Sequence, residues 1–183
     1  MPLTSIRPTA AALRHTSIDS ALGKILLTSD GEHLSGLYLD DFDHILDRLA
    51  TRTGVETVAD DGLDLFATAG EQIAEYFAGT RRTFDLPLAP HGTDFQRQVW
   101  QALTTIPYGA TAGYAELAAW IDRPTAARAV GAANGRNPIS IIVPCHRVIG
   151  ADGALTGYAW GEEKKRFLLD LEADTAKGPN SED

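Results

Sequence analysis

The only cysteine of the chain, Cys145, stands directly before His146 in the stretch Ile141 to Gly150 (IIVPCHRVIG). A thiolate is the reactive form of cysteine, and a free thiol with a pKa near ~8.5 is only a few per cent ionised at neutral pH. A neighbouring imidazole can accept the thiol proton or stabilise the anion, so the pair is a candidate activated nucleophile. The open alternative is that Cys145 is simply a small buried apolar residue.

The residues before Cys145 indicate how the thiol is held. An apolar run, Ile141 to Val143, ends at Pro144, which cannot donate a backbone hydrogen bond and fixes its own φ angle. We therefore expect a buried, strand-like segment that delivers the thiol to a fixed place.

Composition limits the classes of protein. A chain of 183 residues can bury a sizeable core as one domain or two small ones. A single cysteine cannot form an intrachain disulfide, and the five histidines are scattered, so neither an oxidising compartment nor a metal site is expected. No apolar run approaches the ~18 residues of a membrane span, and no signal-peptide pattern opens the chain. We expect a soluble, cytoplasmic protein with no membrane partner.

The formal net charge of −9 is unevenly distributed. Residues 1–92 hold 7 Lys or Arg against 14 Asp or Glu, and residues 151–183 hold 4 against 8. Residues 93–150 instead hold 5 basic residues, all arginine, against 3 acidic ones. Arginine suits forked phosphate contacts and stacking on bases. A broad basic face is therefore excluded, and any surface for nucleic acid must be local.

The first half of the chain predicts a mixed α/β domain. Two strands are expected over Ile18–Thr28 and Leu34–Leu39, joined by a polar turn. Apolar spacing predicts helices over Phe42–Arg52 and Leu63–Gly79. The segment Thr83–Gly92, with two prolines, is the candidate linker. Nothing in this half looks catalytic.

The second half predicts a helical domain. Thr93 or Asp94 can cap a helix whose apolar face comprises Phe95, Val99, Trp100 and Leu103. Two further helices, Tyr114–Ile121 and Ala126–Asn134, are separated by a tight turn, and Thr125 is expected to cap the second. This arrangement is typical of a helix-turn-helix unit, although many helical hairpins that bind nothing share it.

The second of these helices carries one long side chain, Arg128, among tiny residues. Small residues let a helix approach another surface closely, so Arg128 could enter a DNA groove. The alternative, which the helix alone favours, is that the alanines pack on a neighbouring helix and Arg128 is a solvated surface charge.

Taken together, these motifs resemble the O6-alkylguanine-DNA alkyltransferases, suicide repair proteins that remove alkyl groups from guanine O6. The resemblance rests on Pro144–Ile149 (PCHRVI), the active-site signature of that family. Further matches occur in family order over about residues 93–172: Phe95–Trp100 (FQRQVW), Ile106–Gly109 (IPYG), Tyr114, Ala129–Asn134 (AVGAAN), Asn137–Pro138, Gly157–Gly161 (GYAWG) and a closing helix that ends at Glu172.

The resemblance implies an α/β fold with two domains. An N-terminal α/β, ribonuclease-H-like domain over residues 1–92 would precede a mostly α-helical, winged helix-turn-helix-like DNA-binding domain over residues 93–172. Residues 173–183 are expected to form a disordered tail.

The resemblance also assigns the catalytic residues. Cys145 would be the alkyl acceptor, and His146 would polarise it through a bound water. Glu172 would orient the imidazole in a hydrogen-bonded relay. Tyr114 would crowd the phosphate of the target nucleotide and donate a hydrogen bond to the departing guanine.

Other positions would bind DNA or shape the pocket. Arg128 would fill the gap that the flipped nucleotide leaves, and Asn137 would tie the turn that holds the active site to the recognition helix. Tyr158 would wall the alkyl pocket as part of the loop 150–161. The remaining DNA-binding positions implied are Ala127, Ala129, Gly131 and Thr125, and the remaining pocket positions are Val148, Trp160 and Lys165.

The chain departs from the family in two ways. Some members bind zinc through cysteines and histidines of the N-terminal domain, and here Cys145 is the only cysteine, so that site is not expected. Position 160 varies in the family between small and bulky residues. Trp160 is bulky and should narrow the pocket against large O6 substituents.

The function implied is irreversible, stoichiometric transfer of an alkyl group from O6 of guanine, and from O4 of thymine, to Cys145. The partner would be double-stranded DNA that contains O6-alkylguanine, with no cofactor. The protein would act as a monomer, and cooperative binding along DNA stays open. A cysteine hydrolase is the rival enzyme class, although adjacent Cys and His are unusual there. A binder that only flags lesions is the other rival, and the retained Cys145 argues against it.

Overall fold

The computed structural model describes Leu3, residues 12–39 and residues 42–176, and these residues form two compact units. The sheet unit comprises the described residues up to His91 together with residues 138–140. The helical unit comprises residues 92–137 and the described residues from Ile141 onward. Among the described residues, no helix is long and apolar enough to cross a membrane.

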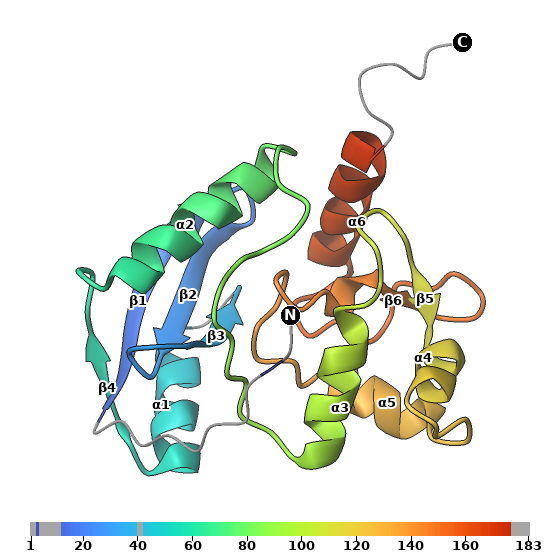
Figure 1. Ribbon diagram of the computed structural model, residues 1–183, viewed down its shortest axis with the longest axis horizontal. Coiled ribbons are helices and arrows are strands. Elements are labelled where there is room, and N and C mark those ends of the chain that lie inside the picture. The colour runs from blue at the N-terminus through green and yellow to red at the C-terminus, as the bar shows by residue number, and fades with distance from the viewer. Residues whose placement is uncertain (1–2, 4–11, 40–41, 177–183) are drawn as a thin grey trace. The chain divides into compact units, whose positions relative to one another are not determined.

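The sheet unit contains four strands in the order β3-β2-β1-β4 (Figure 1). Strand β1 pairs antiparallel with β2, β2 pairs antiparallel with β3, and β1 pairs parallel with β4. The strands span Ala12–Ser20 (β1), Gly23–Ser29 (β2), Leu34–Tyr38 (β3) and Glu56–Ala59 (β4). Two helices accompany them, Phe42–Thr53 (α1) and Asp64–Phe77 (α2).

The single strand predicted over residues 18–28 is wrong, because the chain reverses within it. The turn between β1 and β2 is made by Ser20, whose hydroxyl donates to the Gly23 carbonyl at 2.7 Å and accepts from the Leu22 amide at 3.1 Å. Gly23 adopts a φ of 90°, which suits glycine. Strand β4 was not predicted, since its four residues are too few to show the alternation of apolar and polar residues that marks a strand.

The edge of the sheet at β3 receives two further segments. The Leu34 amide donates to the Pro87 carbonyl at 2.8 Å, so the predicted linker 83–92 is anchored on β3. The Leu37 amide donates to the Pro138 carbonyl at 2.8 Å, and the Ser140 amide donates to the Leu37 carbonyl at 3.2 Å. Residues 138–140 therefore pair with β3 although they follow the helical segment in sequence.

The helical unit contains four α-helices and a small parallel sheet (Figure 1). Its helices span Asp94–Leu103 (α3), Tyr114–Trp120 (α4), Ala127–Asn134 (α5) and Glu162–Ala176 (α6), and its strands span Ala112–Gly113 (β5) and Val148–Ile149 (β6). Helix α3 begins as predicted: Thr93 and Gln96 exchange hydrogen bonds in a capping box. The Trp100 indole N–H then donates to the Ala133 carbonyl at 2.8 Å, which ties α3 to α5.

Two predictions for this unit need correction. Helix α5 begins after Ala126 with no side-chain cap, so Thr125 does not cap it. The closing helix continues past Glu172 to Ala176, so the predicted tail cannot begin at residue 173. The remainder of that tail, residues 177–183, lies outside the described residues.

Candidate active site

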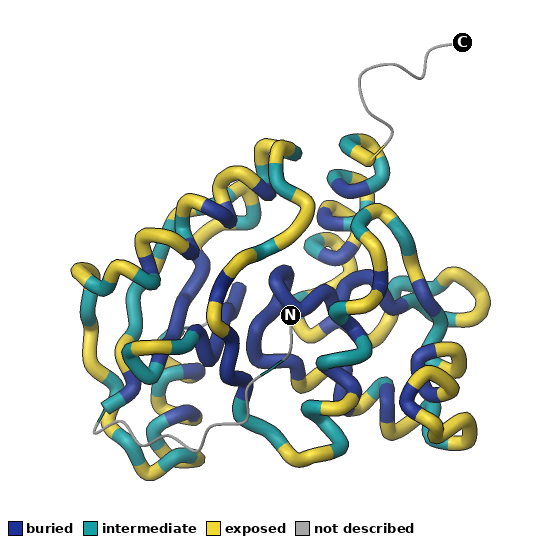
Figure 2. The backbone as a smooth tube through the Cα atoms, in the orientation of Figure 1, coloured by how far each residue is buried: buried dark blue, intermediate teal, exposed yellow. Residues whose placement is uncertain are grey.

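Cys145 is held by buried backbone turns and not by a strand. Residues 141–143 form turns, and Cys145 opens a short 3-10 helix, Cys145–Arg147. The strand-like segment expected before the cysteine is therefore wrong in conformation but right in burial, since every residue from Pro138 to Val148 is buried (Figure 2). Cys145 itself is 3% exposed.

The turn before Cys145 is strained, and Asn137 braces it. Ile141 has a φ of 70°, which costs a β-branched residue ~1–3 kcal/mol. The Asn137 side-chain amide donates to the Val143 carbonyl at 2.7 Å and lies 3.0 Å from the Cys145 sulfur. One buried side chain therefore fixes both the turn and the thiol.

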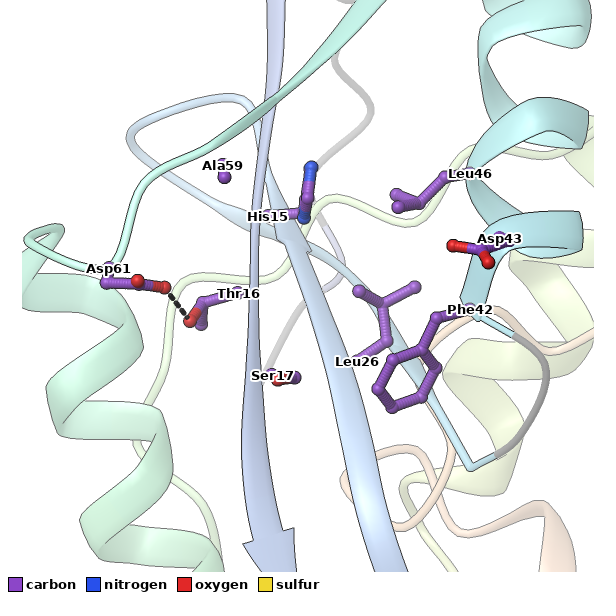
Figure 3. A pocket seen from close by; sticks show the side chains of 9 residues that line it. All are labelled: His15, Thr16, Ser17, Leu26, Phe42, Asp43, Leu46, Ala59 and Asp61. Atoms are coloured by element: carbon purple, nitrogen blue, oxygen red, sulfur yellow. Dashed lines mark hydrogen bonds between the residues drawn. The ribbon is translucent and has the colours of Figure 1, made fainter.

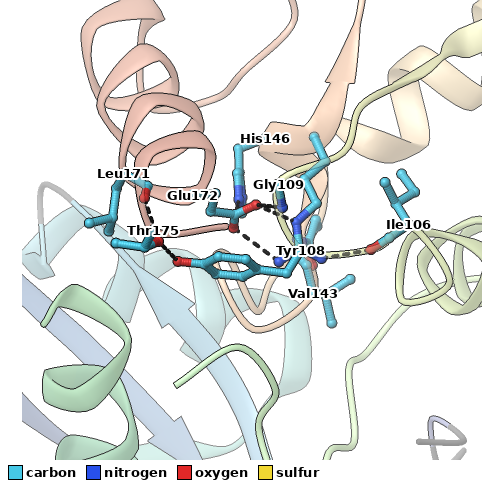
Figure 4. A network of polar contacts seen from close by, with 10 residues as sticks. Ile106, Tyr108, Gly109, Val143, His146, Leu171, Glu172 and Thr175 are labelled. Carbon is cyan, nitrogen blue, oxygen red and sulfur yellow. Dashed lines mark hydrogen bonds and ion pairs between the residues drawn. The ribbon is translucent and has the colours of Figure 1, made fainter. Parts of the chain in front are cut away.

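His146 and Arg147 share one buried carboxylate, that of Glu172 (Figure 4). Oε1 of Glu172 lies 2.8 Å from His146 Nε2. Arg147 donates to both carboxylate oxygens, from Nε to Oε2 at 2.8 Å and from Nη2 to Oε1 at 3.0 Å. The Gly109 amide donates to Oε2 at 3.1 Å. Such a bidentate, fully buried arrangement fixes the imidazole ring rigidly.

The charges of this cluster follow from its partners. Burial alone would raise the pKa of Glu172, but hydrogen bonds from His146 and Arg147 outweigh it and lower that pKa to about 2. Burial lowers the pKa of His146, and the contacts with Glu172 only partly oppose this. At neutral pH the imidazole is neutral and the carboxylate is charged. Nε2 must then carry the ring proton, because a carboxylate can only accept.

Acid should therefore destabilise the protein in two steps. The lowered pKa of His146 makes the folded state lose stability as the pH falls below the ordinary histidine value of 6.5. The lowered pKa of Glu172 removes up to about 3 kcal/mol more between pH 4.5 and 2. Urea unfolding measured across this range should show both steps, and Glu172→Gln should lack the lower one. A free energy of unfolding that is flat from pH 7 to pH 3 would contradict this.

A second group of contacts surrounds the thiol from α4, α6 and the loop after β6. Tyr114 donates to the Thr156 carbonyl at 3.1 Å, and Lys165 donates to the carbonyls of Val148 at 2.6 Å and Thr156 at 3.1 Å. Tyr158 is buried, and its hydroxyl has no hydrogen-bond partner among the residues that the structure describes. Burial raises the pKa of Tyr114 and Tyr158, and Cys145, when ionised, raises the pKa of both further. The thiol thus lies within electrostatic reach of both phenols.

Tyr114 opens α4, and the other residues expected to contact DNA lie on α5 and at its start. Arg128 and Ala129 are exposed, as is Thr125, whereas Ala127 and Gly131 are half-buried. Gly131 lies against the ring of Tyr114, since a Cβ there would stand 3.6 Å from two ring carbons. Val130, Ala133 and Asn134 form the buried face of the helix. The outer face of α5 therefore presents one arginine above small residues.

Sequence reasoning missed two buried polar residues. Arg147 was treated only as part of the signature, yet its guanidinium binds Glu172, donates to the Ile106 carbonyl at 2.7 Å and lies 5.6 Å from the Tyr108 ring centroid. Asn134 donates to the Cys145 carbonyl at 3.3 Å. An arginine inside the apolar run IIVPCHRVI was the available sequence signal for Arg147. No sequence signal pointed to Asn134.

The sheet unit holds a separate hollow of about 260 Å³ (Figure 3). It is lined by His15, Thr16, Ser17, Leu26, Phe42, Asp43, Leu46, Ala59 and Asp61. Thr16 donates to Asp61 at 2.6 Å, so part of its polar lining is already paired. Among the described residues, no group of His, Cys, Asp and Glu could hold a metal ion.

Comparison with known proteins bears on both units. A family model described as "6-O-methylguanine DNA methyltransferase, ribonuclease-like domain" matches residues 13–90, and one described as the DNA binding domain of the same protein matches residues 94–174. A methylated-DNA–protein-cysteine methyltransferase of Methanosarcina barkeri is 48% identical over 162 residues, which cover 87% of this chain and 97% of the relative.

Solved structures agree. The crystal structure of the Mycobacterium tuberculosis O6-methylguanine methyltransferase is 47% identical with a TM-score of 0.77, over 89% of this chain and 94% of that one. The M. tuberculosis protein OGT in complex with DNA is 46% identical with a TM-score of 0.75, over 90% and 94% of the two chains. The expected two-domain fold is confirmed, and the chain belongs to the 6-O-methylguanine DNA methyltransferase family.

Proposed function

We propose that this protein repairs DNA by moving the alkyl group of O6-alkylguanine in duplex DNA onto Cys145. Sulfur attacks the alkyl carbon, the bond from carbon to O6 breaks, and its electrons stay on guanine, which takes up a proton. The thioether has no easy route to hydrolysis, so each molecule acts once, and O4-alkylthymine would react in the same way. The observation that carries this proposal is a single buried thiol beside an imidazole that Glu172 and Arg147 hold in place.

His146 is the proton acceptor in this proposal. Its Nε2 donates a hydrogen bond to Glu172, so Nδ1 is the nitrogen that can accept a proton. Nδ1 is buried, and no described residue hydrogen-bonds to it; buried polar atoms of this kind are usually satisfied by water. We assign to that nitrogen a water that relays the proton from Cys145. Glu172 thereby orients the base and does not itself take the proton.

The damaged nucleotide must leave the duplex, because Cys145 is 3% exposed and cannot reach a stacked base. Extrusion costs a few kcal/mol, and a poorly paired lesion lowers that cost. We assign to Arg128 the filling of the vacated space, and to the outer face of α5 the contact with the groove. Tyr114 would then donate to the departing guanine, with Tyr158, Val148 and Trp160 forming the alkyl pocket.

Two assignments about context complete the proposal. All candidate site residues lie in the helical unit, which supports residues 93–172 as the alkyltransferase domain and residues 1–92 as a structural one. A reactive thiol must stay reduced, and DNA is the partner, so we place the protein in the cytoplasm.

The reaction is tested with duplex DNA that carries radiolabelled O6-methylguanine. Label should move to the protein in a single burst whose amplitude equals the amount of active protein. Repeated turnover, or label released as methanol, would instead indicate a hydrolase.

Arg128→Ala should slow repair of duplex DNA by about ten- to a hundredfold. Flipping the nucleotide out costs a few kcal/mol, and the variant would lack the side chain that offsets part of this cost. Reaction with free O6-methylguanine base, which needs no extrusion, should change little. Arg166→Ala removes the same charge from an exposed position of α6 and serves as the control. Equal losses on both substrates would show that Arg128 does not assist extrusion.

A further inference from the structure

The carbonyl of Thr156 accepts hydrogen bonds from two side chains at once. The Tyr114 hydroxyl donates to it at 3.1 Å, and so does Lys165 Nζ at 3.1 Å. A carbonyl oxygen has two lone pairs, so these two donors fill it. The two side chains come from the start of α4 and from α6.

Lys165 is an unusual residue for this position. Its side chain is fully buried, and none of the ion pairs found among the described residues includes it. Its ammonium group bonds instead to backbone carbonyls, that of Val148 at 2.6 Å and that of Thr156. Lysine is almost never fully buried unless it is paired. Burial lowers the pKa of Lys165, and the charges of Glu162 and of an ionised Cys145 only partly offset this, so its position here calls for a purpose. Lys165 closes the loop that begins at Val148 and ends at Thr156.

Tyr114 is confined by the same loop. Strand β5 pairs with β6 through Ala112 and Val148, which sets the start of α4 beside the loop (Figure 1). Gly157 has a φ of 78°, and a Cβ there would lie 2.5 Å from the Tyr114 hydroxyl. Only glycine allows this approach. The place of the Tyr114 hydroxyl is therefore set by the backbone of Thr156 and Gly157.

We propose that Lys165 is a positioning residue for Tyr114: it holds the Thr156 carbonyl where the Tyr114 hydroxyl rests in the free protein. When Tyr114 turns its hydroxyl to the departing guanine, Lys165 keeps the carbonyl bonded and the loop closed. The loop therefore need not open for Tyr114 to change partners. This inference rests on the proposed role of Tyr114 as the donor to guanine.

Lys165→Met tests the inference. We expect the single-turnover rate of methyl transfer at saturating duplex DNA to fall by about tenfold or more, with the Kd for DNA changed by less than about threefold. Methionine has a similar volume, and loss of the donor to the Val148 carbonyl should cost about 1–3 kcal/mol, so the variant should fold. Lys164→Met, the same substitution one position earlier, is the control and should react at the wild-type rate.

A double-mutant cycle separates positioning of Tyr114 from a general role in the loop. If Lys165 acts through Tyr114, Lys165→Met should cause less than about a twofold further loss in a Tyr114→Phe background. Gly157→Ala, which displaces the Tyr114 hydroxyl, should slow transfer as Lys165→Met does. Gly54→Ala imposes the same kind of backbone strain in open space of the sheet unit and should leave transfer unchanged.

The outcomes are distinguishable. If the rate losses of Lys165→Met and Tyr114→Phe multiply in the double variant, the inference is overturned, while the proposed role of Tyr114 and the proposed reaction still stand. A Tyr114→Phe variant that reacts at the wild-type rate would overturn the role of Tyr114 and the inference with it. A wild-type protein that takes up no methyl group would overturn the proposed function itself.

Discussion

Cys145→Ala should abolish methyl transfer while the variant still binds duplex DNA that contains O6-methylguanine. The chain has no second cysteine to take over, and no other side chain near the relay is a comparable nucleophile at neutral pH. Removal of one buried sulfur should leave the relay of His146, Glu172 and Arg147 in place. Quenched single-turnover assays measure the transfer, and fluorescence anisotropy with a labelled duplex measures the affinity.

Cys145→Ser is the matched variant, since it keeps the size and a hydrogen-bonding group for Asn137. It should also be inactive, because a serine hydroxyl is far less ionised than a thiol at the same pH. Residual transfer in either variant would mean that the wrong acceptor was chosen. Loss of DNA binding in both would mean that the thiol contributes to the interface, contrary to the account.

Glu172→Gln should damage both folding and reaction. The substitution leaves the buried guanidinium of Arg147 without its countercharge, which typically costs 3–5 kcal/mol, or roughly 10 °C in melting temperature for a chain of this size. It also replaces the charged acceptor that keeps the proton of His146 on Nε2 with a neutral amide, which accepts more weakly and can instead present its NH2 group to the ring, so transfer should slow by about a hundredfold or more. Calorimetry and single-turnover kinetics check the two effects.

Two companions sharpen this test. Glu163→Gln, at an exposed position at the start of α6, removes the same charge and should change neither stability nor rate. Arg147→Met combined with Glu172→Gln removes both buried charges and should be more stable than Glu172→Gln alone. The double variant should still react slowly, since the imidazole has lost the carboxylate that orients it. Wild-type stability and rate in Glu172→Gln would refute the relay.

Most of the helices could be predicted because their signals are local. Helix α3 has a capping box and an apolar stripe, and the bounds expected for α1, α2, α4 and α5 were met within two residues at each end. The signature around Cys145 was equally readable, since the residues that do chemistry are adjacent in sequence. The pairing of Glu172 with His146, 26 residues away, came only from the family resemblance.

Other features were not predicted, and most of them depend on tertiary contacts. The two residues between β1 and β2, Ala21 and Leu22, are not typical turn residues. The turn is held instead by a hydrogen bond from the Ser20 side chain and by the positive φ of Gly23. The left-handed Ile141 defies its local preference and persists because Asn137 braces the turn. Thr125 looked like a cap, yet α5 begins without one. The last two cases are local preferences overridden by packing, whereas the turn rests on contacts within residues 20–23.

Mass spectrometry of the protein after exposure to duplex DNA with O6-methylguanine tests the sulfur acceptor most directly. We expect a gain of ~14 Da, as one methyl replaces one hydrogen, in every active molecule. Tryptic digestion should place it in the peptide 137–147, and fragmentation should place it on Cys145. An unmodified protein, or a methyl group found on any other residue, would contradict the account.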